Sequence, residues 1–275
     1  MKFSFICMMC VSLCAEAFAV TVPSPQQVFV MAGQSNMRGS KGIAEGYPKN
    51  NEDAQLDKSI GLFWEVPDVN RTIGGLAKQS GADYMQPQAG LFGPEVSFSR
   101  LVAKNLKPLP VSIFKYSVGG TSLFYDWGGP GSGGLYDDML KSYSDAFGKL
   151  RRLGHPIQLR GLIWVQGESD AENKLMAAQY YFRLKTIISH FRKSQGYEHL
   201  PVVLGVDEDK PWVKVNPAVV DAQKRLAVED PCIAFTSMKG LAKADVTHLT
   251  PQGLVEHGQV LYKAWRRLSL QTVCQ

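Results

Sequence analysis

The chain has 275 residues, of which 45% are hydrophobic and 20% are charged, and its formal net charge is +5. This length is enough for one large domain with a full hydrophobic core. The basic residues are scattered, and pairs such as Arg151-Arg152 and Arg266-Arg267 stand near the ends of predicted helices, where cations suit the helix dipole. Because the positive charges form no continuous patch in the sequence, they argue against a nucleic-acid partner.

The amino terminus has the pattern of a secretory signal peptide. Lys2 precedes a short apolar run over residues 3–14, and Ala17-Phe18-Ala19 forms an A-x-A ending. The apolar run is shorter than the ~20 residues that a membrane span needs. A buried first helix is the alternative, and the A-x-A ending speaks against it. We expect residues 1–19 to be removed, leaving residues 20–275 as a single secreted or periplasmic domain without a membrane span.

Strand-like and helix-like runs alternate along the rest of the chain. Five apolar runs predict strands buried on both faces, as in a parallel sheet covered by helices, at residues 28–32, 111–116, 161–165, 202–206 and 233–236. Helices are predicted at residues 94–105, 136–152, 171–193, 217–229 and 251–270. This alternation predicts a three-layer α/β/α sandwich with a five-stranded, mainly parallel sheet. Residues 38–91 and 128–134 are expected to be irregular loops over the strand ends.

A serine follows the first predicted strand. Gly33 ends the apolar run, so Ser35 is expected at the carboxyl end of a strand, where open α/β sheets bind their ligands. A serine hydroxyl is a weak nucleophile unless a hydrogen-bonded base activates it. Asp245 and His248 stand three residues apart before the last predicted helix, so one loop can present both. Asp245 would hold the histidine tautomer while the other ring nitrogen of His248 faces Ser35.

Donors for a tetrahedral oxyanion follow two other predicted strands. Gly119 and Gly120 come after residues 111–116 and can bring backbone N–H groups close, because no Cβ intervenes. Gln166 ends the run 161–165 and can contribute a side-chain amide. With the N–H of Ser35 this makes three donors, each typically worth ~100- to 1000-fold in rate.

Each of these features also has a purely structural interpretation. A serine after a strand is often a helix cap, the Gly-Gly pair can be an ordinary turn, the segment from Gln166 can cap the following helix, and Asp245 and His248 can be a surface pair. Their joint placement at carboxyl ends of strands favours catalysis. No His, Cys and carboxylate residues have metal-ligand spacing, so we expect neither a metal nor a cofactor.

Two cysteines, Cys232 and Cys274, remain after removal of the signal peptide. An exported compartment permits a disulfide between them. Two free thiols are the alternative, and the sequence does not decide between these states.

Four blocks carry a resemblance to a known family: Gly33-Gln34-Ser35-Asn36-Met37, Gly119-Gly120-Thr121-Ser122-Leu123 with Trp127, Trp164-Val165-Gln166-Gly167-Glu168-Ser169-Asp170, and Asp245-Val246-Thr247-His248-Leu249-Thr250. In this order they resemble the sialate O-acetylesterase and acetylxylan esterase group of the SGNH hydrolases (carbohydrate esterase family 6). The resemblance runs from residue 28 to about residue 268, which is nearly the whole mature chain.

This resemblance implies a flavodoxin-like α/β/α sandwich that removes O-acetyl groups from carbohydrates. It implies that Ser35 is the nucleophile, His248 the base and Asp245 its partner, with Gly120 and Gln166 as oxyanion donors. The Gly-x-Asn-Asp block of the wider superfamily is absent, and the segment from Gln166 stands in its place. Supporting or substrate-binding positions fall on Gln34, Asn36, Gly119, Glu168, Tyr125 and Trp127.

The substrate stays open at this point. Aromatic rings stack on sugar faces, and Tyr125 and Trp127 follow the Gly-Gly turn closely, with Tyr84, Phe92 and Tyr47 as further candidates. Packing onto the domain is the alternative for each ring. Xylan, sialic acid, another acetylated glycan and a peptidoglycan sugar are all candidate substrates. A short-chain lipid or aryl ester hydrolase or a thioesterase would share the triad, and a non-catalytic glycan-binding module is a further alternative. The sequence does not indicate an oligomeric state.

Overall fold

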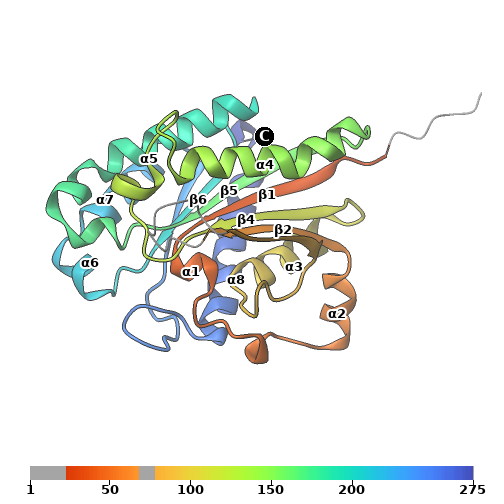
Figure 1. Ribbon diagram of the computed structural model, residues 1–275, viewed down its shortest axis with the longest axis horizontal. Helices are drawn as coiled ribbons and strands as arrows, with labels where there is room; N and C mark the ends of the chain where they lie inside the picture. The colour runs from red at the N-terminus through yellow and green to blue at the C-terminus, as the bar shows by residue number, and fades with distance from the viewer. Residues whose placement is uncertain (1–22, 68–77, 275) are drawn as a thin grey trace, which may run out of the picture.

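The computed structural model describes residues 23–67 and 78–274, so the predicted signal peptide lies outside the described residues. In this part of the chain a seven-stranded sheet, in the order β3-β2-β4-β1-β5-β6-β7, forms the middle layer. Helices cover both faces of the sheet (Figure 1). The predicted three-layer α/β/α sandwich is confirmed.

The sheet is built around β1 (Gln26–Gly33), which is buried along nearly its whole length. It pairs in parallel with β4 (Val111–Ser117) on one side and with β5 (Ile157–Val165) on the other. β6 (Val202–Val206) and β7 (Ile233–Ser237) continue the sheet in parallel beyond β5. All these strands were predicted. Because they are parallel, their carboxyl ends meet at one edge of the sheet.

The segment 38–91 is more ordered than predicted. It forms α2 (Asn51–Asp57), β2 (Ile60–Pro67) and β3 (Lys78–Tyr84). β2 lies parallel to β4, and β3 pairs antiparallel with β2. The prediction of five strands is therefore wrong by two within the described residues. β2 does bury Ile60 and Leu62, but the Gly, Asp and Asn residues around it hide this strand pattern in the sequence. β3 is a strand because it pairs with β2, and not because of its own residues.

The predicted helices all form, with ends within three residues of the expected positions. One face of the sheet carries α4 (Leu135–Arg152), α5 (Lys174–Gln195) and α7 (Ala218–Glu229), and the other carries α3 (Glu95–Leu106) and α8 (Pro251–Ser269) (Figure 1). Shorter helical segments are α1 (Ser35–Arg38), α6 (Pro211–Val215), η1 (Ala44–Gly46), η2 (Leu123–Trp127), η3 (Asp170–Glu172) and η4 (Thr272–Cys274). No helix among the described residues combines the length and apolar character of a membrane span.

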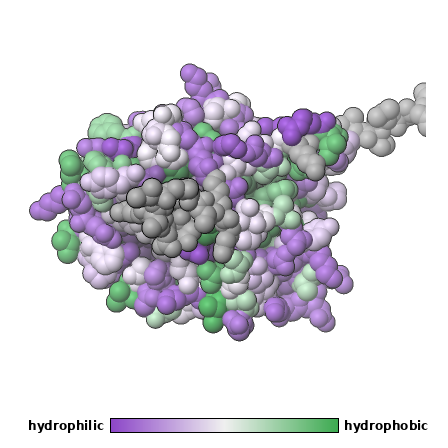
Figure 2. All heavy atoms as spheres, viewed as in Figure 1, coloured by the Kyte–Doolittle hydropathy of each residue, from purple (hydrophilic) through white to green (hydrophobic). Residues whose placement is uncertain are grey.

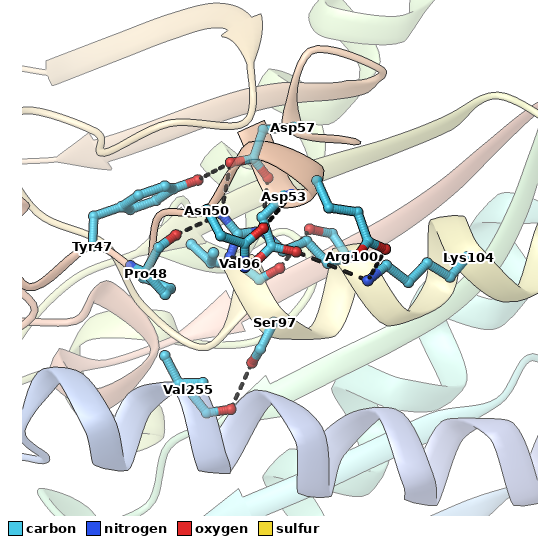
Figure 3. A network of polar contacts seen from close by, with 12 residues as sticks. Tyr47, Pro48, Asn50, Asp53, Asp57, Val96, Ser97, Arg100, Lys104 and Val255 are labelled. Carbon is cyan, nitrogen blue, oxygen red and sulfur yellow. Dashed lines mark hydrogen bonds and ion pairs between the residues drawn. The ribbon is translucent and has the colours of Figure 1, made fainter. Parts of the chain in front are cut away.

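Aromatic residues fill the core on the α3 and α8 side of the sheet. Phe29 of β1 packs edge-on against Phe98 of α3 and Trp265 of α8, with ring centroids 5.3 and 4.9 Å apart. The two helices touch at Gly258, where a Cβ would lie 2.1 Å from Ser97 Oγ. Any larger residue would push the helices apart. Ser97 also donates its hydroxyl to the carbonyl of Val255 at 2.6 Å (Figure 3).

A buried polar network joins the insert 38–59 to α3 (Figure 3). Arg100 donates Nε and Nη2 to the two carboxylate oxygens of Asp57 at 2.8 and 2.7 Å, and Nη1 to Asp53 at 3.1 Å. The hydroxyl of Tyr47 donates to Asp57 at 2.9 Å. Burial, together with the Asp57 charge, raises the pKa of Tyr47, so this hydroxyl keeps its proton. Bidentate geometry of this kind fixes both position and orientation.

A disulfide joins Cys232 and Cys274, the pairing that the sequence left open. Cys232 directly precedes β7, and Cys274 ends η4, the last helical segment. The cross-link therefore fastens the carboxyl terminus to the start of the last strand.

His257 of α8 is fully buried and has no hydrogen-bond partner for either ring nitrogen among the described residues. Its Nε2 lies 3.5 Å from where a Cβ on Gly205 of β6 would be. Burial lowers the pKa of His257 to about 4. A histidine in the unfolded chain titrates near 6.5, so the unfolded state binds more protons between pH 6.5 and pH 4. Stability must therefore fall as the pH drops through this range.

Replacing His257 with Met removes this titration and keeps the volume similar. We expect the loss of unfolding free energy between pH 7 and pH 5 to be smaller in His257→Met than in the wild type, by on the order of 2 kcal/mol. Urea unfolding of both proteins at the two pH values measures the difference. An identical loss in both proteins would contradict this role of His257.

Candidate active site

Ser35 stands where β1 turns into α1. Gly33 has φ +152°, and a Cβ there would lie 2.0 Å from the carbonyl oxygen of Val165 on β5, so only glycine fits. Gln34 donates its backbone N–H to that same carbonyl, and Ser35 then opens the helix. Ser35 is 6% exposed. The strand, the glycine and the short helix thus hold the serine at the carboxyl edge of the sheet, as predicted.

Asp245 and His248 lie in the loop 238–250 between β7 and α8. Asp245 Oδ1 accepts the backbone N–H groups of Thr247 and His248, each at 2.8 Å. His248 Nδ1 lies 3.0 Å from Asp245 Oδ2. The hydrogen bond from His248 is the main reason why the pKa of Asp245 is lowered to about 2, so this carboxylate is ionised at any working pH. The pair leaves Nε2 as the histidine nitrogen that is free to act as a base.

Asn36 joins the serine to this loop. Its side-chain Nδ2 donates to the carbonyl of Thr247 at 3.1 Å, and its Oδ1 accepts the N–H of Leu249 at 3.1 Å. These two residues flank His248 in the chain. The residue next to the serine is therefore hydrogen-bonded to the backbone on both sides of the histidine, although the two lie more than 200 positions apart.

The Gly-Gly turn after β4 lies beside the serine. A Cβ on Gly119 would be 3.7 Å from Ser35 Cβ. Val118 donates its N–H to the carbonyl of Gly33, which sets the turn against the end of β1. Trp127 is fully buried and donates its indole N–H to Thr121 Oγ1 at 3.0 Å. Trp127 is therefore not available to stack on a sugar, and it supports the turn instead.

Gln166 is fully buried, and its amide hydrogens are directed to protein acceptors. Nε2 donates to the carbonyl of Thr121 at 2.9 Å and to Asp170 Oδ2 at 2.7 Å. Its Oε1 has no hydrogen-bond partner among the described residues. In this arrangement Gln166 holds the segment that follows Gly120, and its role as an oxyanion donor stays a prediction.

Asp170 is a further residue of this network that the sequence analysis did not select. Its carboxylate accepts the backbone N–H groups of Leu123 and Phe124 at 2.8 and 3.2 Å, in addition to the amide of Gln166. Burial raises the pKa of Asp170 to about 6 despite these hydrogen bonds. The side chain thus fastens η2, and with it the Gly-Gly turn, to the end of β5.

Two further carboxylates, those of Asp207 and Glu168, support the loop 238–250, which we call the histidine loop. Lys243 donates to both oxygens of Asp207, at 2.8 and 2.7 Å, and Asp207 is fully buried just after β6. The N–H of Asp207 is in turn bonded to Glu168 Oε1 at 3.1 Å. Burial raises the pKa of Glu168. Gln34 Oε1 accepts the N–H of Gly167 at 3.3 Å, so the β1 and β5 ends are joined as well.

The other aromatic candidates differ in exposure. Tyr125 is 73% exposed and Tyr84 is 58% exposed, so both rings are accessible. Phe92 and Tyr47 are buried and pack against each other at 5.4 Å between ring centroids. These two rings belong to the core. Within the described residues no group of three His, Cys, Asp or Glu side chains could hold a metal ion.

The structure thus brings the predicted Ser35, Gly119, Asp245 and His248 to one edge of the sheet. Such a set can transfer an acyl group, because it combines a hydroxyl, a histidine whose Nδ1 is held by a carboxylate, and a glycine turn next to the serine. Sequence reasoning missed Asp170, Asp207 and Lys243. A signal for Asp207 was present, since a carboxylate directly follows a predicted strand, whereas nothing in the sequence pairs it with Lys243.

The ion pair between Lys243 and Asp207 predicts a measurable effect on turnover. Lys243→Met leaves the histidine loop less well fixed, and small displacements of a catalytic group cost up to about 100-fold in rate. We expect kcat for p-nitrophenyl acetate to fall at least tenfold, with partial recovery in Lys243→Arg. Lys239→Met is the matched control, because Lys239 lies in the same loop, is 61% exposed at its side chain and only reaches Glu208 at 3.9 Å. Equal rates in both Met variants would refute the role of the pair.

Known proteins similar to this chain were found by comparison of both sequence and structure. A probable carbohydrate esterase of Arabidopsis thaliana is 23% identical over 258 residues, covering 88% of this chain and 90% of the relative. The X-ray structure of an Arabidopsis thaliana protein has a TM-score of 0.64 at 21% identity, covering 88% of this chain and 98% of that one. A carbohydrate acetylesterase from Xanthomonas citri has a TM-score of 0.59 at 16% identity, covering 88% of this chain and 56% of that one. At these identities the solved structures establish the fold.

The family itself follows from a match to a family model. Residues 25–267 fit the family model described as carbohydrate esterase, sialic acid-specific acetylesterase. This range includes Ser35, the Gly-Gly turn, Gln166 and the histidine loop. The chain therefore belongs to this carbohydrate esterase family and is a carboxylic ester hydrolase.

Proposed function

We propose that this protein is a secreted serine esterase that removes O-acetyl groups from a carbohydrate through a Ser35-His248-Asp245 triad. The observation that carries the proposal is the side chain of Asn36, which bonds the nucleophile segment to both neighbours of His248. The family match supports the acetylated-sugar substrate.

The reaction proceeds in two acyl transfers. Ser35 Oγ attacks the acetyl carbonyl carbon while His248 Nε2 takes its proton, and the backbone N–H groups of Ser35 and Gly120 stabilise the oxyanion. The C–O bond to the sugar breaks, and the departing sugar oxygen takes the proton from His248. A water molecule then attacks the acetyl-serine with His248 again as base, and acetate leaves while Ser35 regains its proton. Gln166 and Asp170 hold the turn that carries Gly120.

Export is part of the same proposal. The Cys232–Cys274 disulfide suits an oxidising compartment, and the amino-terminal sequence has the pattern of a signal peptide. A short-chain lipid or aryl ester hydrolase or a thioesterase is the second candidate, because it would use the same triad. A series of esters from acetate to octanoate distinguishes them: an acetylesterase loses activity as the acyl chain lengthens.

Ser35→Ala tests the nucleophile. We expect acetate release from acetylated xylan, acetylated sialosides and acetylated peptidoglycan to fall by at least ~1000-fold, because the covalent route is removed while the oxyanion donors remain. Ser40→Ala is the matched control, since Ser40 closes the turn after the same helix α1. Wild-type turnover in Ser35→Ala, with the fold checked by circular dichroism, would refute the triad.

Asp245→Asn tests the partner of the base. The ionised carboxylate favours the protonated histidine, so its removal should lower kcat by about 1000- to 10,000-fold at pH 7. Lys41→Met, which removes an exposed partner 3.7 Å from Asp245, should change little. A kcat in Asp245→Asn equal to that of Lys41→Met contradicts this assignment.

A further inference from the structure

Two neighbouring aromatic residues, one exposed and one partly buried, adjoin the candidate active site on one side. Tyr125 and Phe124 lie in η2, only a few residues after Gly120, and their ring centroids are 4.7 Å apart. The N–H of Phe124 and the amide of Gln166 bond to the same carboxylate, that of Asp170. The two rings therefore lie close to the Gly-Gly turn. Only a few residues separate them from Gly120, and Asp170 binds both Phe124 and Gln166.

Helix α5 continues this surface. The guanidinium of Arg183 lies 4.5 Å from the ring centroid of Phe124, and its Nε and Nη2 both donate to Gln179 Oε1, at 3.2 and 3.0 Å. Stacking on a ring and pairing with a neighbour together restrain this side chain. Phe182, beside Arg183 on α5, is 67% exposed. The surface thus combines apolar ring faces with oriented N–H groups.

The surface is hollowed along α5. A hollow of about 450 Å³ lies between residues 128–129 and the side chains of Gln179, Phe182, Arg183 and Thr186. An adjoining hollow of about 440 Å³ shares Phe182 and Thr186 and is lined further by Pro130, Lys185, Ser189, His190 and Lys193. We call the two together the α5 trough. At a rise of 1.5 Å per residue, the stretch of α5 that lines it is about 20 Å long.

The form of the trough indicates the kind of ligand. Both hollows are shallow and open to solvent, unlike an enclosed pocket for a small molecule. On the face drawn in Figure 2, hydrophobic residues are interspersed with hydrophilic ones, which is usual for a folded protein. In the trough the ring of Phe182 is flanked by an amide, a guanidinium, hydroxyl groups, an imidazole and two ammonium groups. A chain of sugar rings fits this pattern, since each ring has an apolar face and hydroxyl groups at its edge.

We propose that the α5 trough is a binding site for the polysaccharide chain on which the acetyl group is carried. The inference rests on the proposed function and adds to it that the substrate is a polymer, with Phe182 and Tyr125 stacking on sugars that lie outside the triad. Arg183 and Gln179 bond to their hydroxyl groups. A sugar chain that runs from Ser35 past η2 would reach the trough at Arg183, because the guanidinium of Arg183 stacks on the ring of Phe124.

The test compares a polymer with a small ester. In Phe182→Ala and Tyr125→Ala, kcat/KM for acetylated xylan should fall about tenfold relative to kcat/KM for p-nitrophenyl acetate, and Phe182→Trp should restore the ratio. Val228→Ala, an 86% exposed position on α7, is the control and should keep the wild-type ratio. An unchanged ratio in both alanine variants would overturn the trough as a glycan site.

Binding is measured separately from hydrolysis. In affinity gels that contain deacetylated xylan, the wild type and Ser35→Ala should be retarded equally, and Phe182→Ala less. Equal migration of Phe182→Ala and the wild type overturns the proposal, as does an absence of any retardation. A wild type that releases no acetate from any sugar ester would instead overturn the proposed function, because the gel result does not depend on turnover.

Discussion

The site depends on one amide side chain that joins the beginning of the folded chain to its end. Asn36 donates to the residue before His248 and accepts from the residue after it. The amide carries its donor and its acceptor on two separate atoms, whereas an ionised aspartate can only accept and leucine can do neither. These bonds span 211 and 213 positions and are partly or fully buried, so solvent does not compete with them fully. The position of His248 relative to Ser35 follows from this bridge.

Buried polar groups around this bridge share a common role. Asp170 holds the turn after β4, Asp207 with Lys243 holds the loop after β7, and Glu168 contacts the backbone of Asp207. Their burial is costly, as the raised pKa values of Asp170 and Glu168 show. In return, the hydrogen bonds of these carboxylates fix several backbone segments at the same edge of the sheet. Catalytic loops are otherwise among the more mobile parts of a protein.

The sequence was a good guide wherever one local pattern decides the outcome. Fully apolar runs predicted the parallel strands, and a glycine before Ser35 predicted the turn that only a glycine can make. β3 was missed because it depends on its neighbour rather than on its own residues. Trp127, Phe92 and Tyr47 show the same limit, since an aromatic residue in a loop can point outward or inward, and only packing decides. The pairing of Lys243 with Asp207 joins two loops, and no local pattern encodes it.

The cross-link between Cys232 and Cys274 encloses β7, the histidine loop and α8 within a single covalent ring. If a protease cleaves the chain at Val246, which is 67% exposed, the disulfide keeps the two pieces attached to each other. Such a nicked molecule would migrate as one band without a reducing agent and as two bands with it. A single full-length band on a non-reducing gel therefore does not prove that the loop is uncut.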